Sequence, residues 1–404
     1  MAQTLKFGNG TWATKEGSTL AYNDENNNYK PLPFTTTRDS IATRVNKEGL
    51  IEVVGNDVPR IDYTDSADGV LLLEPSKANL ITYSQDFSQW TKQSGGTGSV
   101  PIITSNDTIS PDGTQNADKV VFDKGTSYTT ADLSILSTSF TSQSNTASIY
   151  IKADSPQRIV IRNSSTWVGY DIGTEWTRIE KTDTGGSLQI GLRDGYGIAD
   201  VPSTATVYLW GAQVEQGSYP TSYIPTSGST VQRAADTATG AGNSEVFNDS
   251  QGVLYLNIAA LVNSDTPRAI SISDGTLANR VYIYYSTNNN IEAAIKVSGT
   301  DQAAFTANLT DSTLFNKIAI KYKENDFAIW VNGIEVDSDL SGSIFNANTL
   351  TELAFDLGDG SNDLYGKTKE LGYYDEILTD EELEYLTSYR SLNELVTELN
   401  LNEL

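Results

Sequence analysis

Three aspartates lie close together in a glycine-rich stretch, DLGDGSND, at positions Asp356, Asp359 and Asp363. Carboxylate oxygens on a loop are ligands that Ca²⁺ prefers. A second stretch, DSDLSGSIFNAN, begins like a calcium loop and has Gly342 at its sixth position, but Asn348 stands where a bidentate glutamate should close the site. Ordinary turns in an acidic chain explain both stretches equally well. We therefore expect that no cofactor is required, and that Ca²⁺ at the three aspartates is the candidate metal.

Tyrosines in the stretch VYIYYST are the second candidate for chemistry. Adjacent residues of a strand point to opposite faces, so we expect at least one of Tyr284 and Tyr285 to be exposed. Flat aromatic rings suit stacking on sugar rings. The predicted glycan-binding residues are therefore these two tyrosines together with Asp356 and Asp359. Five tryptophans on strand-like stretches are better explained as core side chains: Trp90, Trp167, Trp176, Trp210 and Trp330.

Residue types that are missing restrict the chemistry further. The chain has no histidine, which excludes Ser-His-Asp and Cys-His hydrolases, typical zinc sites and most proton shuttles that work near neutral pH. It has no cysteine, so no disulfide framework holds it together. Two carboxylates could in principle hydrolyse a glycosidic bond, but a sequence cannot show that two of them lie at the required separation. We expect a non-enzymatic protein, with a carboxylate-based glycosidase as the alternative.

Composition and charge limit the partners and the fold. The net charge is −25, from 27 basic and 52 acidic residues, and such a chain would repel nucleic acid and anionic lipid surfaces. No stretch of about 18 consecutive apolar residues occurs, so membrane insertion is not expected. At 404 residues, with 38% apolar and 20% charged residues, the chain is long enough for two or three domains. Short alternating runs separated by turn residues predict an all-β protein.

The predicted organisation has four parts. Residues 1–84 mix short apolar runs with prolines and polar turns, which predicts a loosely folded arm that needs a partner surface. Residues 85–228 contain runs such as QRIVIRN and TEWTRIEKTD, typical of an antiparallel sandwich. Residues 229–390 repeat this rhythm, and residues 391–404 form a helical tail.

In the third part, the stretch KIAIKYK alternates cleanly between apolar and charged side chains. This places Ile318, Ile320 and Tyr322 on one face and predicts that the lysines between and beside them are solvated. Those lysines are Lys317, Lys321 and Lys323. The alternation therefore predicts a strand with one buried face.

Two helices are expected near the C-terminal end. Thr379 and Glu382 have the spacing of a capping box, so a helix should start there, with Leu383 and Leu386 facing the sandwich. A second Ser-x-x-Glu start precedes four apolar residues at helical spacing: Leu392, Leu395, Val396 and Leu399. This tail either packs on its own domain or associates with other copies of itself.

Two stretches of the third part resemble a known fold family. The hairpin NKIAIKYKENDFAIWVNGIEV, with its Asn332-Gly333 turn, and the later stretch ELGYYDEILTDEELEYL occur in the order seen in the laminin-G-like, concanavalin-type jelly roll. The similarity covers about 155 residues. The calcium and glycan loops of this family vary, so the resemblance transfers no site residue.

The middle part resembles the carbohydrate-binding-module-like sandwich common in phage virion proteins. The resemblance rests on five stretches in order: NLITYSQDFSQWTK, SPDGTQNADKVV, ASIYIKA, GTEWTRIEKT and VYLWGAQVEQGSYPTSYIPT. The preceding stretch, from ATRVNKEGL to NLITYS, is similar to a segment found before this module in phage tail and head-fibre proteins.

Together these resemblances imply a bacteriophage virion protein: a head fibre, capsid decoration or tail appendage. The implied partners are other virion proteins, bound through residues 1–84, and a host-surface glycan, and the implied oligomer is a trimer. The implied location is the surface of the particle, after assembly in the host cytoplasm. The alternatives are a virion-associated depolymerase and a purely architectural virion protein.

Overall fold

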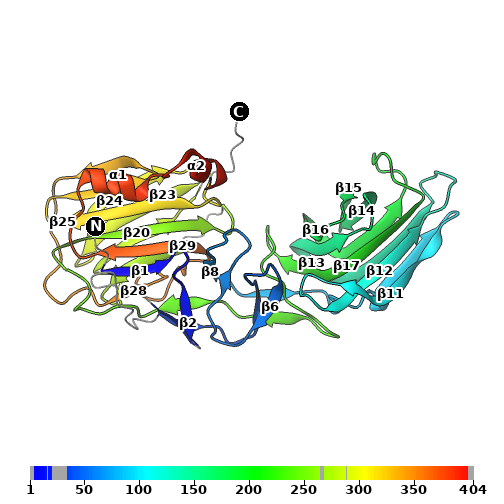
Figure 1. Ribbon diagram of the computed structural model, residues 1–404, viewed down its shortest axis with the longest axis horizontal. Coiled ribbons are helices and arrows are strands. Elements are labelled where there is room, and N and C mark those ends of the chain that lie inside the picture. The colour runs from blue at the N-terminus through cyan, green and yellow to red at the C-terminus, as the bar shows by residue number, and fades with distance from the viewer. Residues whose placement is uncertain (1–3, 16, 21–33, 264–267, 288, 399–404) are drawn as a thin grey trace. The chain divides into compact units, whose positions relative to one another are not determined.

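The computed structural model describes residues 4–15, 17–20, 34–263, 268–287 and 289–398. The chain is all-β, with antiparallel sheets and two short helices near its C-terminal end, as the sequence predicts (Figure 1). It divides into two compact units. Unit 1 comprises residues 1–40, 54–75 and 235–404, and unit 2 comprises residues 41–53 and 76–234. In the described part of the chain, no helix is long and apolar enough to cross a membrane.

Unit 1 is built from two main sheets and a small one. The larger sheet, in spatial order, contains β27 (Ile334–Asp339), β26 (Phe327–Val331), β25 (Asn316–Lys323), β20 (Gln251–Ala260), β29 (Gly366–Tyr374), β8 (Val70–Leu73) and β7 (Ile61–Asp62), with β1 (Leu5–Gly8) also paired to β29. The five-stranded sheet contains β24 (Thr300–Asn308), β23 (Asn290–Val297), β22 (Arg280–Tyr285), β21 (Arg268–Ser273) and β28 (Glu352–Ala354). The small sheet contains β19 (Thr237–Thr239), β4 (Phe34–Thr37), β3 (Ser18–Leu20) and β2 (Ala13–Lys15).

The core of unit 1 follows from the alternation of these strands. Side chains from both main sheets form one buried cluster, which includes Ile318, Ile320 and Tyr322 on the predicted face of β25. Strands β26 and β27 are joined by the predicted two-residue turn, with Asn332 at φ 49° and Gly333 at φ 86°. Positive φ at both positions is what a type I′ hairpin turn requires, so the Asn-Gly pair fixes this hairpin.

Residues 1–84 do not form the separate arm that the sequence predicts. Strand β1 pairs with β29, so that the blue and orange strands run side by side in Figure 1, and β8 pairs with the other end of β29. Leu5, Phe7 and Leu71 belong to the core of unit 1. Residues 41–53 and 76–84 belong to unit 2. Each of these strands is short, but long-range pairing satisfies its backbone and buries its apolar side chains.

The outer face of the larger sheet is covered by helix α1 (Asp380–Thr387). Thr379 caps this helix and Glu382 completes the capping box, while Leu383 and Leu386 are buried, as predicted. They pack in a second cluster with side chains of the sheet that include Trp330. The helix therefore starts at the predicted residue and buries the predicted face.

The prediction that the lysines of β25 are solvated is wrong for two of them. Lys317 is 7% exposed and its Nζ lies 3.0 Å from the Ser388 carbonyl oxygen, while Lys321 is 8% exposed and lies 2.6 Å from an Asp326 carboxylate oxygen. The C-terminal residues cover this face of the sheet, so the lysines reach polar partners at its rim instead of open solvent.

The tail helix α2 (Leu392–Glu398) packs on its own unit. Glu394 forms an ion pair with Lys317 on β25, and Glu398 forms one with Lys369 on β29. Leu392 is 66% exposed, and Leu399 lies outside the described residues. Charged contacts to two strands therefore hold this short helix, and no side chain that the structure describes in it is buried.

Unit 2 is one strongly curved eight-stranded sheet with a few short additions. Its order is β11 (Ser99–Ile109), β12 (Gln115–Asp123), β17 (Thr204–Gln216), β13 (Leu133–Lys152), β16 (Thr177–Arg193), β14 (Gln157–Asn163) and β15 (Thr166–Ile172), with β10 (Thr91–Gly95) also on β13. The additions are the pairs β5 (Ala42–Val45)–β6 (Ile51–Val54) and β9 (Lys77–Asn79)–β18 (Val231–Arg233), and the 3₁₀ helix η1 (Phe87–Gln89).

The two longest strands of unit 2, β13 and β16, pair with each other along most of their length. The pairing of β13 with β16 is irregular between Ser139 and Gln143. The first half of β13 pairs with β10 and the second half with β17, while β16 pairs with both halves, so β13 is a central strand of the sheet. The prediction that most tryptophans are core residues is confirmed for Trp90, Trp167, Trp210 and Trp330, which are each at most 7% exposed.

A buried charge cluster in unit 1 links segments that are far apart in the sequence. Asp236 accepts a hydrogen bond from Arg38 at 2.9 Å and also pairs with Arg60, and Arg60 pairs with Glu74 at 2.7 Å. Burial lowers the pKa of Arg60, but the charges of Asp236 and Glu74 outweigh this and raise it. The backbone carbonyl of Gly55 also accepts a hydrogen bond from Arg38. The cluster therefore lies beside all four points at which the chain leaves or re-enters unit 1.

Removing the central acid should destabilise unit 1. In Asp236→Ala two buried guanidinium groups lose their shared carboxylate, and we expect the free energy of unfolding to fall by about 3–5 kcal/mol. Urea denaturation of the full chain measures this. The control is Glu52→Gln in unit 2, where a partly exposed pair with Arg44 at 2.7 Å should contribute no more than about 1 kcal/mol. Equal losses in the two variants would contradict a central role for the cluster.

Candidate functional site

The outward face of the five-stranded sheet carries the densest group of chemically useful side chains in unit 1. Val281, Ile283 and Tyr285 on β22 point into the core, so the residues that alternate with them point outward. Strand register then aligns three rows across the sheet: Asp301, Lys296, Arg280, Ser273 and Glu352; Ala304, Ala294, Tyr282, Ser271 and Ala354; Thr306, Glu292, Tyr284, Ala269 and Asp363.

Two tyrosines and an arginine form a column along β22. The rings of Tyr282 and Tyr284 are stacked, with centroids 5.8 Å apart and an interplanar angle of 25°. The Arg280 guanidinium carbon lies 4.7 Å from the centre of the Tyr282 ring. The Tyr284 hydroxyl donates a hydrogen bond to the Glu292 carboxylate on the next strand. Both rings are half-buried, so each keeps part of its surface accessible.

Small side chains surround this column. Ala269 and Ser271 on β21 and Ala294 on β23 lie opposite the two tyrosines and are all buried. The Ser271 hydroxyl has no hydrogen-bond partner among the described residues. Beyond β21, Gly358 lies so close to Ser273 that an added Cβ would stand 3.1 Å from the serine Cβ. The loop after β28 therefore folds over one side of the face, and the tyrosines stand between this loop and the more open strands β23 and β24.

Carboxylates gather where that loop meets the sheet. Burial raises the pKa of Asp356, and the Asp359 charge adds a smaller upward contribution. Burial also raises the pKa of Glu352 and Asp363, and Asp356 is the charged neighbour of both. Asp363 accepts a hydrogen bond of 3.1 Å from the Tyr365 hydroxyl. Partly desolvated carboxylates of this kind are strong hydrogen-bond acceptors for hydroxyl groups.

The structure separates the residues that the sequence grouped together. Tyr284 lies on the outward face, whereas Tyr285 is fully buried and its hydroxyl donates to the Ile258 carbonyl oxygen at 2.8 Å, so it is unavailable to a ligand. Asp356 is 3% exposed and accepts a hydrogen bond from the Gly358 backbone nitrogen, while Asp359 is exposed and turned toward Ser361. Within the described ranges, no group of three or more acidic side chains is placed to hold a metal ion.

Sequence reasoning missed the neighbours that make Tyr284 part of a site. Ser271 and Glu292 come from the two neighbouring strands, and only strand register brings them beside the tyrosines. The signal available in the sequence was the spacing of Arg280, Tyr282 and Tyr284, which places them on one face of a strand. Pairing partners cannot be found from that spacing.

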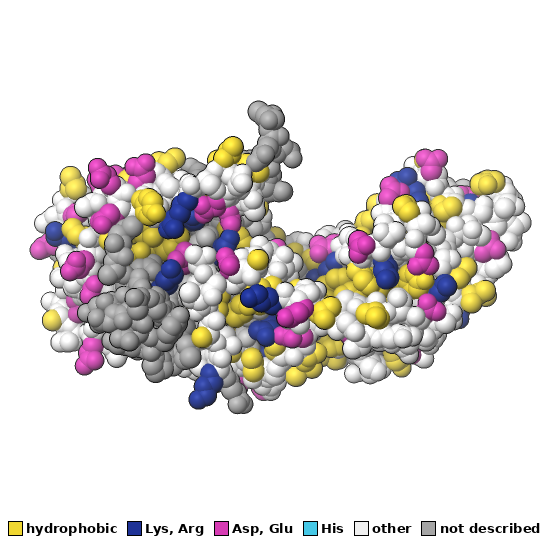
Figure 2. All heavy atoms as spheres, viewed as in Figure 1, with side chains coloured by type: hydrophobic (Ala, Val, Ile, Leu, Met, Phe, Trp, Pro, Cys, Tyr) yellow, Lys and Arg dark blue, Asp and Glu magenta, His cyan; other side chains and the backbone are white. Residues whose placement is uncertain are grey.

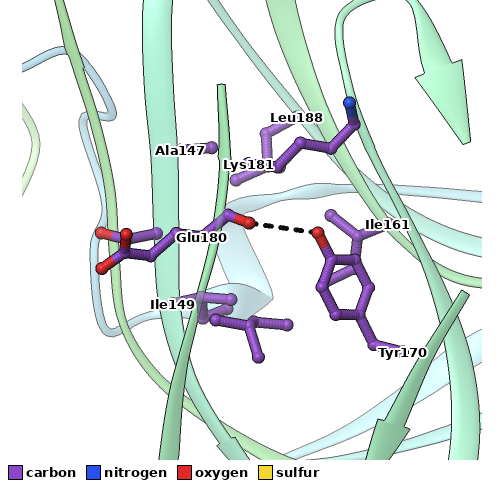
Figure 3. Close-up of a pocket in the computed structure, with 9 residues that line it drawn as sticks. Ala147, Ile149, Ile161, Tyr170, Glu180, Lys181 and Leu188 are labelled. Atoms are coloured by element: carbon purple, nitrogen blue, oxygen red, sulfur yellow. Dashed lines mark hydrogen bonds between the residues drawn. The ribbon is translucent and has the colours of Figure 1, made fainter. Parts of the chain in front are cut away.

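A small cavity in unit 2 is lined by side chains from strands β13, β14, β15 and β16 (Figure 3). Apolar side chains that include Ile149, Ile161 and Leu188 line it, and the Tyr170 hydroxyl donates to the Glu180 backbone carbonyl oxygen at 3.1 Å. Its volume is about 10 Å³, which is room for about one water molecule. This cavity is a packing defect of the core and is too small for a sugar.

Larger hollows lie beside the two helices of unit 1. One of about 510 Å³ is lined by residues that include Leu392 and Leu395, and a neighbouring one of about 490 Å³ includes Tyr385. Tyr389 borders both, and its hydroxyl donates to the Asn332 side-chain oxygen at 3.1 Å. That hydrogen bond ties the residue to the β26–β27 turn, so its role here is structural.

Surface charge does not single out another site. Acidic and basic side chains are scattered over the visible face of each unit (Figure 2). The negative net charge is thus spread over the surface in this view.

Comparison with known proteins gives distant structural likenesses. No protein-family model and no curated protein matches the chain. Among solved structures, the CBM40 domain of Ruminococcus gnavus IT-sialidase bound to α2,3-sialyllactose has a TM-score of 0.32 and 14% identity, over 36% of this chain and 86% of that one. Domain 4 of AbnA, a GH43 arabinanase from Geobacillus stearothermophilus in complex with arabinotriose, has a TM-score of 0.32 and 10% identity, over 43% and 84%. The binding domain of botulinum neurotoxin serotype G has a TM-score of 0.30 and 14% identity, over 38% and 39%.

The raised pKa of Asp356 predicts how stability depends on pH. A carboxyl whose pKa is raised by folding destabilises the folded state once it ionises, so its cost is absent below the unfolded pKa and grows as the pH rises through the folded pKa. Asp356→Asn removes the ionisation and keeps an oxygen to accept from Gly358. We expect this variant to be more stable than the native chain at pH 7 and to lose that advantage below about pH 4, near the ordinary aspartate pKa. Thermal unfolding across this range measures the difference, and a constant difference would contradict the assignment.

Proposed function

We propose that the chain is a non-enzymatic carbohydrate-binding protein whose unit 1 binds sugar on the outward face of the five-stranded sheet. The observation that carries the proposal is the half-buried Tyr282–Tyr284 column between small side chains, with charged hydrogen-bonding groups on both sides. Aromatic rings bind the apolar face of a sugar ring, and carboxylates and guanidinium groups bind its hydroxyls.

Each element of the face has a defined part in this proposal. The sugar ring stacks on the accessible part of Tyr284, whose orientation is fixed by its hydrogen bond to Glu292. Glu292 and Asp363, on opposite sides of the tyrosine, accept hydrogen bonds from sugar hydroxyls. The proposed site requires no metal, and its fixed rings limit the entropy lost on binding.

The proposed setting is a bacteriophage particle, where the chain would be a head fibre, capsid decoration or tail appendage that binds host-surface glycans. The resemblance of residues 1–84 and 85–228 to virion proteins supports this setting. Trimeric assembly would place several weak sugar sites on one particle and raise their combined affinity. The strands of residues 1–84 are already paired within the chain, so anchoring to other virion proteins would use their exposed side chains.

Electron microscopy of particles labelled with antibody against this chain tests the setting. We expect label at a regular position on the surface of intact particles. Deleting residues 1–84 would be a poor test because it removes core residues such as Phe7 and Leu71. Particles that carry no label while the chain is present in the lysate would contradict the virion role.

Replacing the tyrosine should abolish most sugar binding. A glycan array with the full chain identifies a neutral ligand, and calorimetry then compares variants. We expect Tyr284→Ala to weaken binding about tenfold, equivalent to about 1.4 kcal/mol, because the stacking surface is lost. The matched control is Tyr385→Ala, an exposed tyrosine on α1 of the same unit, which should leave the affinity unchanged.

Two outcomes would count against the proposal. Unchanged affinity in Tyr284→Ala would show that sugar binds elsewhere, and an array without signals would favour a purely architectural protein. Release of oligosaccharide from host capsular polysaccharide would instead support the alternative of a carboxylate-based depolymerase.

A further inference from the structure

Unit 2 carries a cluster of arginines and aromatic rings that the face in unit 1 does not involve. The guanidinium carbons of Arg162 on β14 and Arg193 on β16 each lie 5.8 Å from the centre of the Trp167 ring on β15. The Arg193 guanidinium is also 4.9 Å from the centre of the Tyr196 ring. The two rings have centroids 6.4 Å apart. Three strands and the loop after β16 thus bring two positive charges to one aromatic pair.

The positive charges of this cluster are not neutralised within the chain. Among the described residues, no carboxylate lies within 4 Å of Arg162 or Arg193. The nearest acid in sequence, Asp194, is held by Lys124 at 2.7 Å. Arg162 donates to the Ser164 carbonyl oxygen, and Arg193 makes one long contact of 3.5 Å with the Thr130 carbonyl oxygen. The cluster therefore presents positive charge in a chain whose net charge is −25.

Several hydrogen-bond donors of the cluster are also unused. The Nε atom of Arg193 and the Nε1 atom of Trp167 are buried and have no hydrogen-bond partner among the described residues. Trp167 is 7% exposed, so it forms the floor of the cluster, beneath the two guanidinium groups. Buried donors without acceptors cost free energy, which an incoming acceptor would recover.

Tyr196 is the exposed residue of the cluster, and its backbone has an unfavourable conformation. Its side chain is 62% exposed, and its φ of 60° lies in the left-handed region, which a bulky residue rarely adopts. The Lys124–Asp194 ion pair fixes the loop just before it. Ile198 packs against Gly169 on β15 and fixes the loop just after it. The ring is thus held in place at the surface.

We propose that this cluster is a second sugar-binding site, specific for saccharides that carry a carboxylate. The sugar ring stacks on Tyr196, and its carboxylate accepts charge-assisted hydrogen bonds from Arg193 and Arg162. A guanidinium matches the two oxygens of a carboxylate, which favours this group over a neutral hydroxyl. The site is independent of the face in unit 1, so either can fail without the other.

The test measures binding of two carboxylated probes to the full chain, each beside an uncharged counterpart. The probes are digalacturonate with its dimethyl ester, and 3′-sialyllactose with lactose. We expect at least one acid to bind at least tenfold more tightly than its counterpart by calorimetry. Arg193→Gln and Arg162→Gln should each weaken that binding at least tenfold, and Tyr196→Ala should weaken it several-fold.

Matched variants separate this site from general charge effects and from unit 1. Arg158→Gln removes a positive charge on the same strand, β14, from a residue that has an acidic partner, Asp171, at 3.6 Å, and it should change affinity less than twofold. All variants are compared in a Tyr284→Ala background, which removes most binding of neutral sugar rings at the face in unit 1. Because Tyr196 is largely exposed, its variant should fold even if an arginine variant does not.

The proposal is overturned if neither acid binds more tightly than its counterpart. It is also overturned if Arg158→Gln weakens binding as much as Arg193→Gln, or if Tyr196→Ala has no effect. In the Tyr284→Ala background none of these results depends on whether unit 1 binds neutral sugar.

Discussion

The structure depends on one buried carboxylate. Asp236 pairs with Arg38 and Arg60 and accepts a hydrogen bond from the Glu74 backbone nitrogen, so three segments separated by many residues meet at it. Each arginine would be costly to bury without this acid, and the acid would be costly without the arginines. Because the acid and the arginines need each other, their ion pairs fix the arrangement of the segments that enter and leave unit 1. The larger sheet, which packs against the sheet that carries the proposed sugar face, is then completed by strands from both ends of the chain.

Local patterns predicted the local structure well. The Asn332-Gly333 turn, the Thr379 cap and the buried face of β25 are all where the sequence indicates, because each depends on a few neighbouring residues. The arm predicted for residues 1–84 is wrong because its short strands are stabilised by partners hundreds of residues away. In the candidate site the sequence identified Tyr284 but could not identify Glu292 or Ser271, because register between strands is a property of the whole sheet.

The two proposed sites differ in their charge. The face in unit 1 places tyrosines beside carboxylates whose pKa is raised by burial, which suits neutral hydroxyl-rich sugars. The cluster in unit 2 places a tyrosine and a tryptophan beside arginines, which suits acidic sugars. Because the chain as a whole carries a net charge of −25, the arginines supply a local attraction for anions that the whole chain does not. One chain would thus recognise two chemically distinct features of a glycan surface.

The pairing of β1 with β29 has a consequence for synthesis on the ribosome. Thr4 and Asp375 hydrogen-bond to each other across 371 residues of sequence. At about 5–20 residues per second, the first strand waits on the order of 20–70 s before its partner emerges. During that time Leu5 and Phe7, which are buried in the finished unit, lack the strand β29 with which β1 pairs. The newly made chain should therefore depend on chaperones, and its yield should be most sensitive to temperature before translation ends.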